Sequence, residues 1–335
     1  MTPLSPHEQV IEMMFGAILS NALVSVGELG VADAIPVDQT RPIDDIARST
    51  GCHERALYRT LRYLASNGVF HEHDGRHFGH TALSAILRSD HPQSVLPVIC
   101  LSQRLHVAHP HFLHSLRTEQ SALESAWGEP MFSYLAKRPD DAAVFDAGMP
   151  ALHGDETAPM LDAYDFSPIG TLMDVGGGGG TMIAEILRRH AGMRGILFDL
   201  DHVVERARHH LVDHGVADRC ETLSGSFFDA VPPGAEAIVM RHIVHDFLDD
   251  DAEQIMSNCR KALPSDGRVL VVEAVVPAGN EPSPAKVMDM GMLLYPGGME
   301  RTVDEYSELF EASGFELTSV TPTASMVSVI EGRPV

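Results

Sequence analysis

Basic residues are scarce in this sequence: 24 lysines and arginines stand against 47 aspartates and glutamates, so the formal net charge of the 335 residues is −23. A negative charge opposes binding to nucleic acid or to anionic membranes, although it says nothing about a small neutral pocket. No apolar run reaches the roughly 18 residues of a membrane span. The first residues lack a basic stretch followed by an apolar one, so no secretory signal is visible. We therefore expect a cytoplasmic protein with neither a membrane nor a nucleic acid as partner.

Cysteine is also rare. The four cysteines are widely spaced and form no CxxC or other metal-ligand pattern, which is typical of a reduced intracellular protein; they are Cys52, Cys100, Cys220 and Cys259. The hydrophobic fraction of 44% over 335 residues is ordinary for a globular protein long enough for two domains. Neither a disulfide nor a metal centre is expected.

Glycine, in contrast, is concentrated in one segment. The apolar stretch 172–175 runs into the five glycines 176–180, and a helical pattern follows over 182–187. Glycines permit positive φ and let a ligand approach the bare backbone, while the start of a helix directs N–H groups at that ligand. The segment predicts a strand, a tight turn and a helix that together bind a ligand.

A second strand, over 195–198, ends at Asp199. The separation from the glycine loop is 199 − 176 = 23 residues. That is close to the roughly 20 residues expected of an acidic side chain that binds ribose hydroxyls in a Rossmann unit. We expect Asp199 to bind the ribose of a nucleoside cofactor.

The spacing within the glycine loop helps to choose the cofactor. A dinucleotide fingerprint Gly-x-Gly-x-x-Gly fails from Gly176 and from Gly177, because its third glycine falls on Thr181 or Met182. The tighter Gly176-x-Gly178-x-Gly180 resembles motif I of class I S-adenosylmethionine (SAM) methyltransferases. Because SAM has free ribose hydroxyls but no pyrophosphate, it requires the acidic residue more than a phosphate cradle. An NAD-dependent dehydrogenase is the alternative.

The first 100 residues have the pattern of a winged helix. Helices are predicted over 10–19, 22–30, 43–47 and 54–64, and Asp74-Gly75 marks a hairpin between 69–72 and 76–78. Leu57, Leu61 and Leu64 recur at helical spacing as one buried stripe. A winged helix that binds DNA would use arginines, but residues 1–100 contain seven arginines, no lysine and eleven acidic residues, which gives 7 − 11 = −4. Dimerisation is therefore the favoured interpretation of this domain.

The N-terminal stretches 28–33, 57–64 and 68–70 resemble the small-molecule O-methyltransferases. That family includes plant caffeate and flavonoid enzymes, acetylserotonin O-methyltransferase and bacterial antibiotic-tailoring enzymes. The resemblance implies an α/β chain with two parts. Residues 1–100 would form a mainly helical, winged-helix-like domain that dimerises. Residues 101–335 would contain a helical connector (101–165) and a Rossmann-like SAM-binding catalytic domain.

The same resemblance implies a cofactor site. Besides Gly176, Gly178 and Asp199, the positions that match the family's SAM-binding residues are Leu200, Ser226, Phe227 and Arg241. Ser226 stands where the family usually has aspartate in Gly-Asp-Phe-Phe, so it retains a hydrogen bond to adenine but supplies no charge.

The segment 241–251 is similar to the family's Leu-His-Asp-Trp motif, with Phe247 in place of tryptophan. The resemblance makes His245 the general base, and it makes Glu273 and Glu300 the acidic pair that brackets this base. A carboxylate bound to one imidazole nitrogen fixes the tautomer and leaves the other nitrogen to accept a proton. The positions that match the acceptor pocket are Met149, Asp246, Asp289 and Met292.

Two features suggest a metal, and both have simpler interpretations. His106, His109, His111 and His114 crowd one stretch without partner carboxylates, so a histidine that hydrogen-bonds substrate is favoured over a metal ligand. The acidic run 249–251 is expected to cap the helix 252–262, since Asp250 and Glu253 have capping-box spacing.

The sequence thus predicts a SAM-dependent O-methyltransferase that acts on a small, aromatic hydroxyl compound of secondary metabolism, antibiotic biosynthesis included. The predicted partners are the acceptor and a second copy of the chain. One alternative is a relative that binds SAM without transferring methyl, such as a hydroxylase, decarboxylase or pericyclase. Another is a winged-helix regulator that senses SAM.

Overall fold

The computed structural model describes residues 4–335 in two compact units. The first unit comprises Met1–Val107 and Leu135–Gly154, and the second comprises Ala108–Tyr134 and Asp155–Val335. Parts of the predicted connector therefore belong to each unit. Its residues are largely helical, as the sequence predicts. Within it, α9 begins at Pro139, because proline suits the first helical position, where no N–H is needed.

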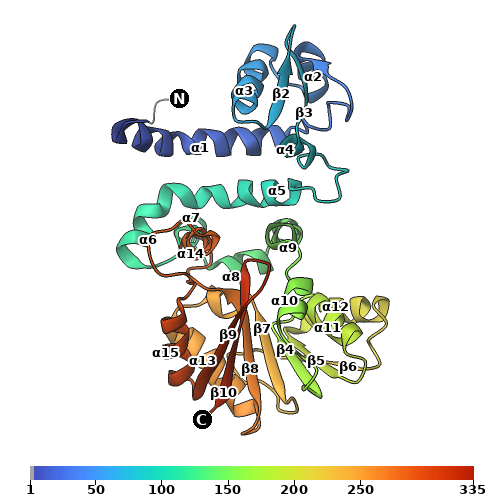
Figure 1. Cartoon of the computed structure of the whole chain (residues 1–335), viewed down its shortest axis with the longest axis vertical. Coiled ribbons are helices and arrows are strands. Elements are labelled where there is room, and N and C mark those ends of the chain that lie inside the picture. The colour runs from blue at the N-terminus through green and yellow to red at the C-terminus, as the bar shows by residue number, and fades with distance from the viewer. Residues whose placement is uncertain (1–3) are drawn as a thin grey trace. The chain divides into compact units, whose positions relative to one another are not determined.

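The N-terminal unit contains the predicted winged-helix elements (Figure 1). These are α1 (Pro6–Glu28), β1 (Arg41–Pro42), α2 (Ile43–Thr50), α3 (Glu54–Ser66), β2 (Phe70–His73) and β3 (His77–His80). The strands form an antiparallel sheet in the order β1-β3-β2, and the turn residue Gly75 has φ 72°, as a tight hairpin requires. Leu57, Leu61 and Leu64 are buried, which confirms the predicted stripe.

Further helices complete this unit: α4 (Ala82–Ala85), α5 (Leu96–Leu105) and α9 (Pro139–His153). Two glycines allow the helices to pack closely. A Cβ at Gly27 of α1 would lie 2.6 Å from Ile99 Cδ1, and one at Gly148 of α9 would lie 2.7 Å from Leu101 Cβ. Side chains of α5 therefore pack directly against the backbone of α1 and of α9.

Helix α1 corrects two expectations. The sequence predicts two helices over 10–30, whereas one continuous helix of 23 residues is present. The expectation that no apolar stretch is long enough to span a membrane is also wrong. By length and composition alone, α1 could cross a membrane: an 18-residue window within it has a mean hydropathy of 1.7, and only 11% of that window is buried. No charged residue lies between Glu12 and Glu28, so α1 is apolar over most of its length. Met13, Met14 and Phe15 are 76%, 67% and 57% exposed, so α1 presents an apolar surface.

The second unit is built around a seven-stranded sheet in the order β6-β5-β4-β7-β8-β10-β9. The strands are β4 (Thr171–Val175), β5 (Arg194–Asp199), β6 (Cys220–Ser224), β7 (Ala237–Arg241), β8 (Arg268–Ala274), β9 (Phe315–Pro322) and β10 (Val327–Pro334). The pairs from β6 to β8 are parallel, and β10 pairs antiparallel with both β8 and β9. Such a sheet aligns the carboxyl ends of its parallel strands at one edge, where ligands bind.

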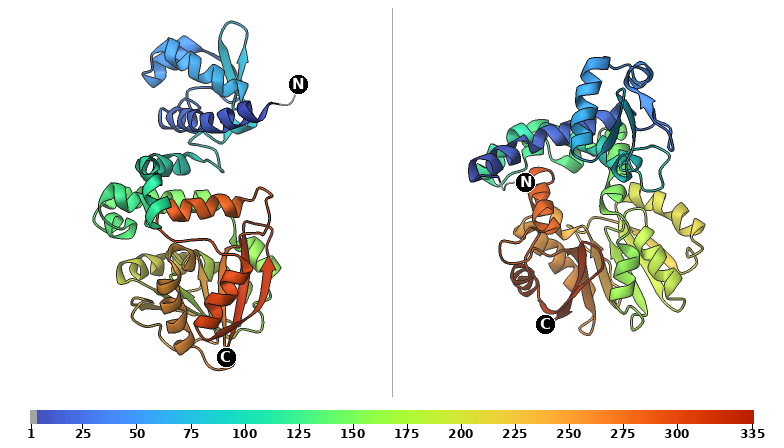
Figure 2. Two further views of the ribbon diagram at one scale, coloured as in Figure 1. Left: turned by 90° about the vertical axis from the view of Figure 1, so that its left-hand side faces the viewer. Right: turned by 45° about the horizontal axis from the view of Figure 1, so that its top comes forward.

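Helices cover both faces of this sheet. On one face lie α10 (Thr157–Ala163), α11 (Thr181–Arg189) and α12 (Asp201–Asp213), and on the other lie α13 (Asp249–Ala262) and α15 (Val303–Ala312) (Figures 1 and 2). The remaining helices are η1 (His106–His111), α6 (Phe112–Thr118), α7 (Ala122–Trp127), α8 (Met131–Ala136), η2 (Val244–Asp246) and α14 (Pro284–Leu294).

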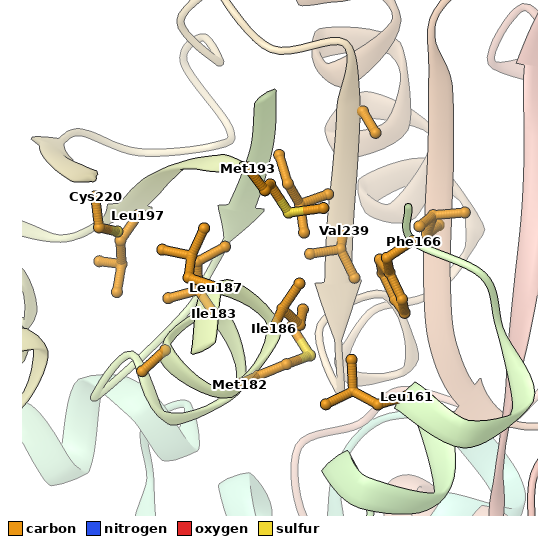
Figure 3. Close-up of a cluster of buried hydrophobic side chains, with 14 of the residues drawn as sticks. Leu161, Phe166, Met182, Ile183, Ile186, Leu187, Met193, Leu197, Cys220 and Val239 are labelled. Atoms are coloured by element: carbon orange, nitrogen blue, oxygen red, sulfur yellow. The ribbon is translucent and has the colours of Figure 1, made fainter. Parts of the chain in front are cut away.

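Each face of the sheet buries its own apolar core. Ile183, Ile186 and Leu187 of α11 pack with Leu197 of β5 and Val239 of β7 (Figure 3). The opposite core joins α13 and α15 to the alternate side chains of the same strands. Because both faces are covered, the central strands are continuous apolar runs, which is why the sequence predicts them well.

The predicted strands over 172–175 and 195–198 are confirmed as β4 and β5. The fold class expected from the sequence, a Rossmann-like α/β domain with a mainly helical N-terminal domain, is likewise confirmed. The capping box expected at Asp250 and Glu253 is wrong, because α13 begins at Asp249 after Leu248 and no side chain caps it. Asp249 is instead bound to Arg301, at 2.8 Å.

Candidate functional site

The glycine loop lies at the carboxyl edge of the sheet, between β4 and α11. Gly176, Gly178 and Gly180 all have positive φ, of 71°, 55° and 78°. A Cβ at Gly176 would lie 2.4 Å from Ile243 Cδ1, whereas a Cβ at Gly178 would enter open space. Gly176 is thus required by packing and by conformation, while Gly178 keeps the backbone accessible.

Asp199 is joined to this loop. In the parallel register Val175 lies beside Phe198, so the loop after β4 and the end of β5 meet. The Asp199 carboxylate accepts the Gly178 N–H at 2.8 Å and the Leu200 N–H at 2.6 Å. Each carboxylate oxygen has a second lone pair, so Asp199 can bind ribose hydroxyls while it holds the loop.

Other predicted cofactor residues follow the neighbouring strand ends. Leu200, after β5, is 49% exposed. Ser226 follows β6, and its hydroxyl accepts the Phe228 N–H at 3.2 Å. Phe227 is half-buried, and its ring packs edge-to-face against Phe247. These residues line the same edge as Asp199, because β5 and β6 are adjacent parallel strands.

Arg241 ends β7 and donates to the Thr157 hydroxyl at 2.7 Å. The next residue, His242, has φ 56°, which is uncommon for a residue other than glycine and marks a constrained turn. Its Nε2 lies 2.7 Å from Glu156 Oε2. Burial and the nearby His245 and Arg241 lower the pKa of His242 to about 3, so this imidazole is neutral.

The turn η2, which carries His245, is held by a buried carboxylate. Glu273 Oε1 accepts the backbone N–H groups of Ile243, Val244 and His245 at 3.1, 2.7 and 3.1 Å. Tyr306 donates its hydroxyl to Glu273 Oε2 at 2.7 Å, and both side chains are fully buried. Glu273 therefore binds the backbone of the turn rather than the imidazole.

A buried guanidinium holds the same turn from the other side. Arg301 is 0% exposed and donates to the carbonyl oxygens of Val244, at 3.3 Å, and Phe247, at 3.1 Å. The loop before it packs directly on the backbone of His245, because a Cβ at Gly298 would lie 2.0 Å from the His245 carbonyl oxygen. Met299 also donates its N–H to that oxygen, at 2.9 Å.

The imidazole of His245 contacts the other predicted glutamate. Its Nδ1 lies 2.7 Å from Glu300 Oε1, and its Nε2 lies 3.7 Å from Asp246 Oδ1. Asp289 of α14 accepts the Glu300 N–H at 3.1 Å. The structure thus brings His245, Asp246, Asp289, Glu273 and Glu300 together.

Burial alone would lower the pKa of His245, but its hydrogen bond to Glu300 and the charges of the surrounding carboxylates raise that pKa to about 9. Burial raises the pKa of Asp246 to about 7, against the opposing effect of His245. Burial likewise raises the pKa of Glu300, against its hydrogen bond to His245. The carboxylates and the imidazole therefore share protons as a coupled group.

The predicted acceptor residues belong to both units. Met292 is buried on α14, in the same unit as His245, and Met149 is half-buried on α9 of the N-terminal unit. Of the crowded histidines, His109 lies 3.3 Å from the Tyr295 hydroxyl and His111 lies 2.9 Å from the Ser125 hydroxyl.

The sequence analysis missed three buried residues of the site: Asp174, Arg301 and Tyr306. Asp174 is 1% exposed beneath the glycine loop, and its Oδ2 has no hydrogen-bond partner within residues 4–335. Burial raises its pKa to about 7, against the opposing charge of Arg241. The position of Asp174, two residues before the first glycine of the loop, was a usable signal. Arg301 instead contacts residues 52 to 57 positions away, and Tyr306 contacts a residue 33 positions away.

Comparison with known proteins shows the family to which this chain belongs. The O-methyltransferase domain family matches residues 110–316, and the O-methyltransferase dimerisation domain matches residues 11–90. The chain belongs to the O-methyltransferase family, and it is a SAM-dependent O-methyltransferase.

Particular relatives span nearly the whole chain. The phenazine O-methyltransferase PhzM of Lysobacter antibioticus is 40% identical over 97% of this chain and 96% of its own length. The crystal structure of the O-methyltransferase NcsB1 from neocarzinostatin biosynthesis, with SAM and 2-hydroxy-5-methyl naphthoic acid, has a TM-score of 0.83 and 32% identity, and covers 95% of this chain and 96% of that one. The aclacinomycin 10-hydroxylase RdmB of Streptomyces purpurascens is 30% identical over 96% of this chain and 89% of its own length.

The buried guanidinium should be essential to the turn that carries His245. We expect Arg301→Lys to lower the free energy of unfolding by about 1–3 kcal/mol, because a single ammonium cannot reach two carbonyls and Asp249 at once. Thermal denaturation measures this loss. The matched control is Arg333→Lys, whose side chain is 40% exposed. Equal melting temperatures for the two variants would contradict the role of Arg301.

Proposed function

We propose that this enzyme transfers the methyl group of SAM in line to a hydroxyl of a small aromatic metabolite, with His245 as the general base. The contact of 2.7 Å between His245 Nδ1 and Glu300 is the observation that carries the proposal. This contact supports an imidazole of fixed tautomer, as a general base requires. His245 also lies at the edge of the sheet that carries the glycine loop.

The residues at this edge fit SAM. Asp199 offers free lone pairs for ribose hydroxyls, Gly178 leaves its backbone open, and Asp174 has an unpaired buried oxygen for a donor group. Ser226 and Phe227 supply a hydroxyl and a ring for the adenine, with Leu200 and Arg241 beside them. When bound, SAM supplies an electrophilic methyl group on a sulfonium, so the chain needs mainly to align the acceptor.

His245 would remove the acceptor's proton. Because Glu300 is a carboxylate, Nδ1 donates to it and Nε2 retains the lone pair that accepts a proton. A phenol has a pKa near 10, roughly, so complete deprotonation beforehand is unfavourable, and Nε2 should take the proton as the oxygen attacks. The Glu300 carboxylate stabilises the imidazolium that forms. Glu273 acts indirectly, since it positions the backbone that carries His245.

The acceptor is proposed to be aromatic. The relatives act on or bind fused-ring compounds: PhzM is a phenazine O-methyltransferase, and NcsB1 is bound to a naphthoic acid. Within the unit that carries His245, Met292 and Asp289 are the acceptor residues that we propose for this chain. Soft methionine side chains suit a flat ring, and Asp289 also holds the Glu300 N–H.

A non-methylating activity, as the name of RdmB indicates for that relative, is the second candidate. The intact contact between His245 and Glu300 favours methyl transfer, because an enzyme that transfers no methyl need not keep a hydrogen-bonded base. Products heavier by one methylene after incubation with SAM distinguish the two.

We further propose that the enzyme works as a cytoplasmic homodimer. Helix α1 exposes Met13, Met14 and Phe15, and all three lie within the matched dimerisation domain, residues 11–90. A second copy of the chain would remove this apolar surface from water. That explanation accounts for the hydropathy of α1 without a membrane.

Asp199→Ala should weaken SAM binding. The loss of hydrogen bonds to a charged group, about 1.5–3 kcal/mol, corresponds to a dissociation constant about 10- to 100-fold higher by calorimetry. Asp201→Ala is the control, because Asp201 is exposed two residues further on. An unchanged dissociation constant for Asp199→Ala would remove this assignment.

The base predicts a pH dependence. His245→Gln should keep SAM binding but lower turnover by about 10²–10⁴-fold. Because His245 must be neutral to accept a proton, wild-type turnover should rise as the pH increases through its raised pKa. Glu300→Gln removes the carboxylate that raises this pKa, so the acid limb of the pH profile should move to lower pH. If His245→Gln retains the wild-type rate and profile, or the Glu300→Gln limb moves upward, the base lies elsewhere.

A charge on the apolar face of α1 should separate the subunits. We expect Met14→Asp to give a monomer in sedimentation at micromolar concentration, because an aspartate cannot be buried unpaired in an apolar interface. Val212→Asp adds the same charge to an exposed apolar residue of α12, outside the matched dimerisation domain, and should leave the dimer intact. A wild-type chain that sediments as a monomer would contradict the proposal.

A further inference from the structure

The second unit contains two largely buried polar side chains, His242 and Glu156, that the proposed reaction does not use. These side chains are 13% and 2% exposed, and His242 Nε2 lies 2.7 Å from Glu156 Oε2. Glu156 stands at the N-terminal end of α10 but does not cap that helix. A second contact lies beside the first, because Arg241 donates to the Thr157 hydroxyl at 2.7 Å. The end of β7 and the start of α10 are thus joined at two adjacent residues.

His242 also has an uncommon backbone conformation. Within residues 4–335, three residues other than glycine have positive φ: Arg76, Glu119 and His242. Arg76 lies in the hairpin between β2 and β3, and Glu119 directly follows α6; left-handed residues are ordinary in both settings. His242 lies instead between β7 and η2. Such a conformation persists where the surrounding structure fixes it, and it occurs most often at functional sites.

The imidazoles of His242 and His245 lie against each other. Their ring centroids are 5.0 Å apart and their planes are inclined by 32°, within the range of packed aromatic rings. His242 donates its N–H to the Val272 carbonyl at 3.4 Å, so its backbone continues along the sheet, while Glu156 holds its ring. His242 therefore gives the imidazole of His245 a fixed neighbour.

The base benefits from such a neighbour. Its Nδ1 is bound to Glu300 at 2.7 Å, but one hydrogen bond still lets the imidazole plane rotate about that contact. Removal of a proton requires Nε2 to point at the acceptor oxygen within a narrow range of distance and direction. We infer that His242, held by Glu156, is a positioning residue that fixes the plane of the His245 imidazole. This inference rests on the proposed function, in which His245 is the general base.

The charge of His242 suits this role. Burial and the nearby His245 and Arg241 lower its pKa to about 3, although Glu273 acts in the opposite direction. The ring therefore stays neutral while His245 gains a proton. A cation in the same place would repel the imidazolium and hinder that step. A neutral imidazole that donates its Nε2 proton to Glu156 supplies a packed ring without an opposing charge.

His242→Asn removes the ring but keeps the backbone conformation. Asparagine tolerates positive φ, and its amide can still donate to Glu156. With 1,4-dihydroxy-2-naphthoic acid as the acceptor, we expect kcat to fall by about 10- to 100-fold, because a misplaced base takes the proton poorly. KM, the SAM dissociation constant and the melting temperature should stay near their wild-type values. A wild-type kcat in this variant would show that His242 serves only the backbone, and would overturn the inference.

The acid limb of turnover distinguishes positioning from proton transfer. Because Glu300 still raises the pKa of His245, the limb should keep its wild-type pH in His242→Asn. Loss of the limb would make His242 the titrating group and would contradict a positioning role. The matched control is Glu119→Asn, which places the same residue at another left-handed position. It should change neither kcat nor the limb, and an equal fall of kcat in this control would also count against His242.

Glu156 should act through the same ring. Glu156→Gln keeps an acceptor for the His242 N–H and should retain most of the wild-type kcat, whereas Glu156→Ala releases the ring and should lower kcat as His242→Asn does. The double variant Glu156→Ala/His242→Asn should be no slower than the slower single variant, because both changes remove one shared constraint. Losses that multiply would show that the two residues act independently, which would overturn the inference.

A proton resonance tests the positioning without turnover. In the complex with S-adenosylhomocysteine, the Nδ1 proton between His245 and Glu300 should give a downfield signal that is absent in His245→Gln. We expect this signal to broaden in His242→Asn and in Glu156→Ala, because a mobile ring exchanges the proton with water faster, and to stay sharp in Glu119→Asn. A sharp signal in all variants that retain His245 would overturn the inference. Broadening in a chain that methylates no acceptor would support the positioning and reject the proposed function.

Discussion

The site depends on one turn, residues 243–247, which is held between two buried groups of opposite charge. Glu273 accepts its N–H groups, and Arg301 donates to its carbonyls. A three-residue 3₁₀ turn pairs only a few of its own backbone groups, and in a buried position the others must be satisfied from elsewhere. The two charges satisfy them and so fix the direction of the His245 side chain. The same arrangement satisfies much of the bonding capacity of both buried ions, which would be costly if unpaired.

The sheet supplies the positions from which these groups act. Parallel pairing of β7 with β8 sets Arg241 beside Val272, so Glu273 necessarily lies next to the first residues of the turn. Parallel pairing of β4 with β5 likewise sets the glycine loop beside Asp199. The glycine loop, Asp199 and His245 thus share one edge of one sheet, although they come from separate βα units.

The two histidines of the motif have different electrostatic environments. His245 is surrounded by carboxylates that raise its pKa, whereas burial next to other positive groups lowers the pKa of His242. Only one of the adjacent rings can therefore take up and release a proton near neutral pH. The neutral His242, bound to Glu156, adds no competing proton acceptor of similar pKa.

By itself, the sequence determined the local features: the glycine loop, the acidic end of the second strand, the winged-helix pattern and the family to which the chain belongs. These depend on contacts between near neighbours or on strands buried on both faces, and both leave a pattern in the order of residues. The sequence placed Glu273 and Glu300 near the base but could not divide their tasks. Only the tertiary structure showed that Glu300 binds the imidazole while Glu273 binds the backbone, and that Arg301 and Tyr306 complete the arrangement. Those contacts join residues 28 to 57 positions apart, so they are decided by strand order and register rather than by any local pattern.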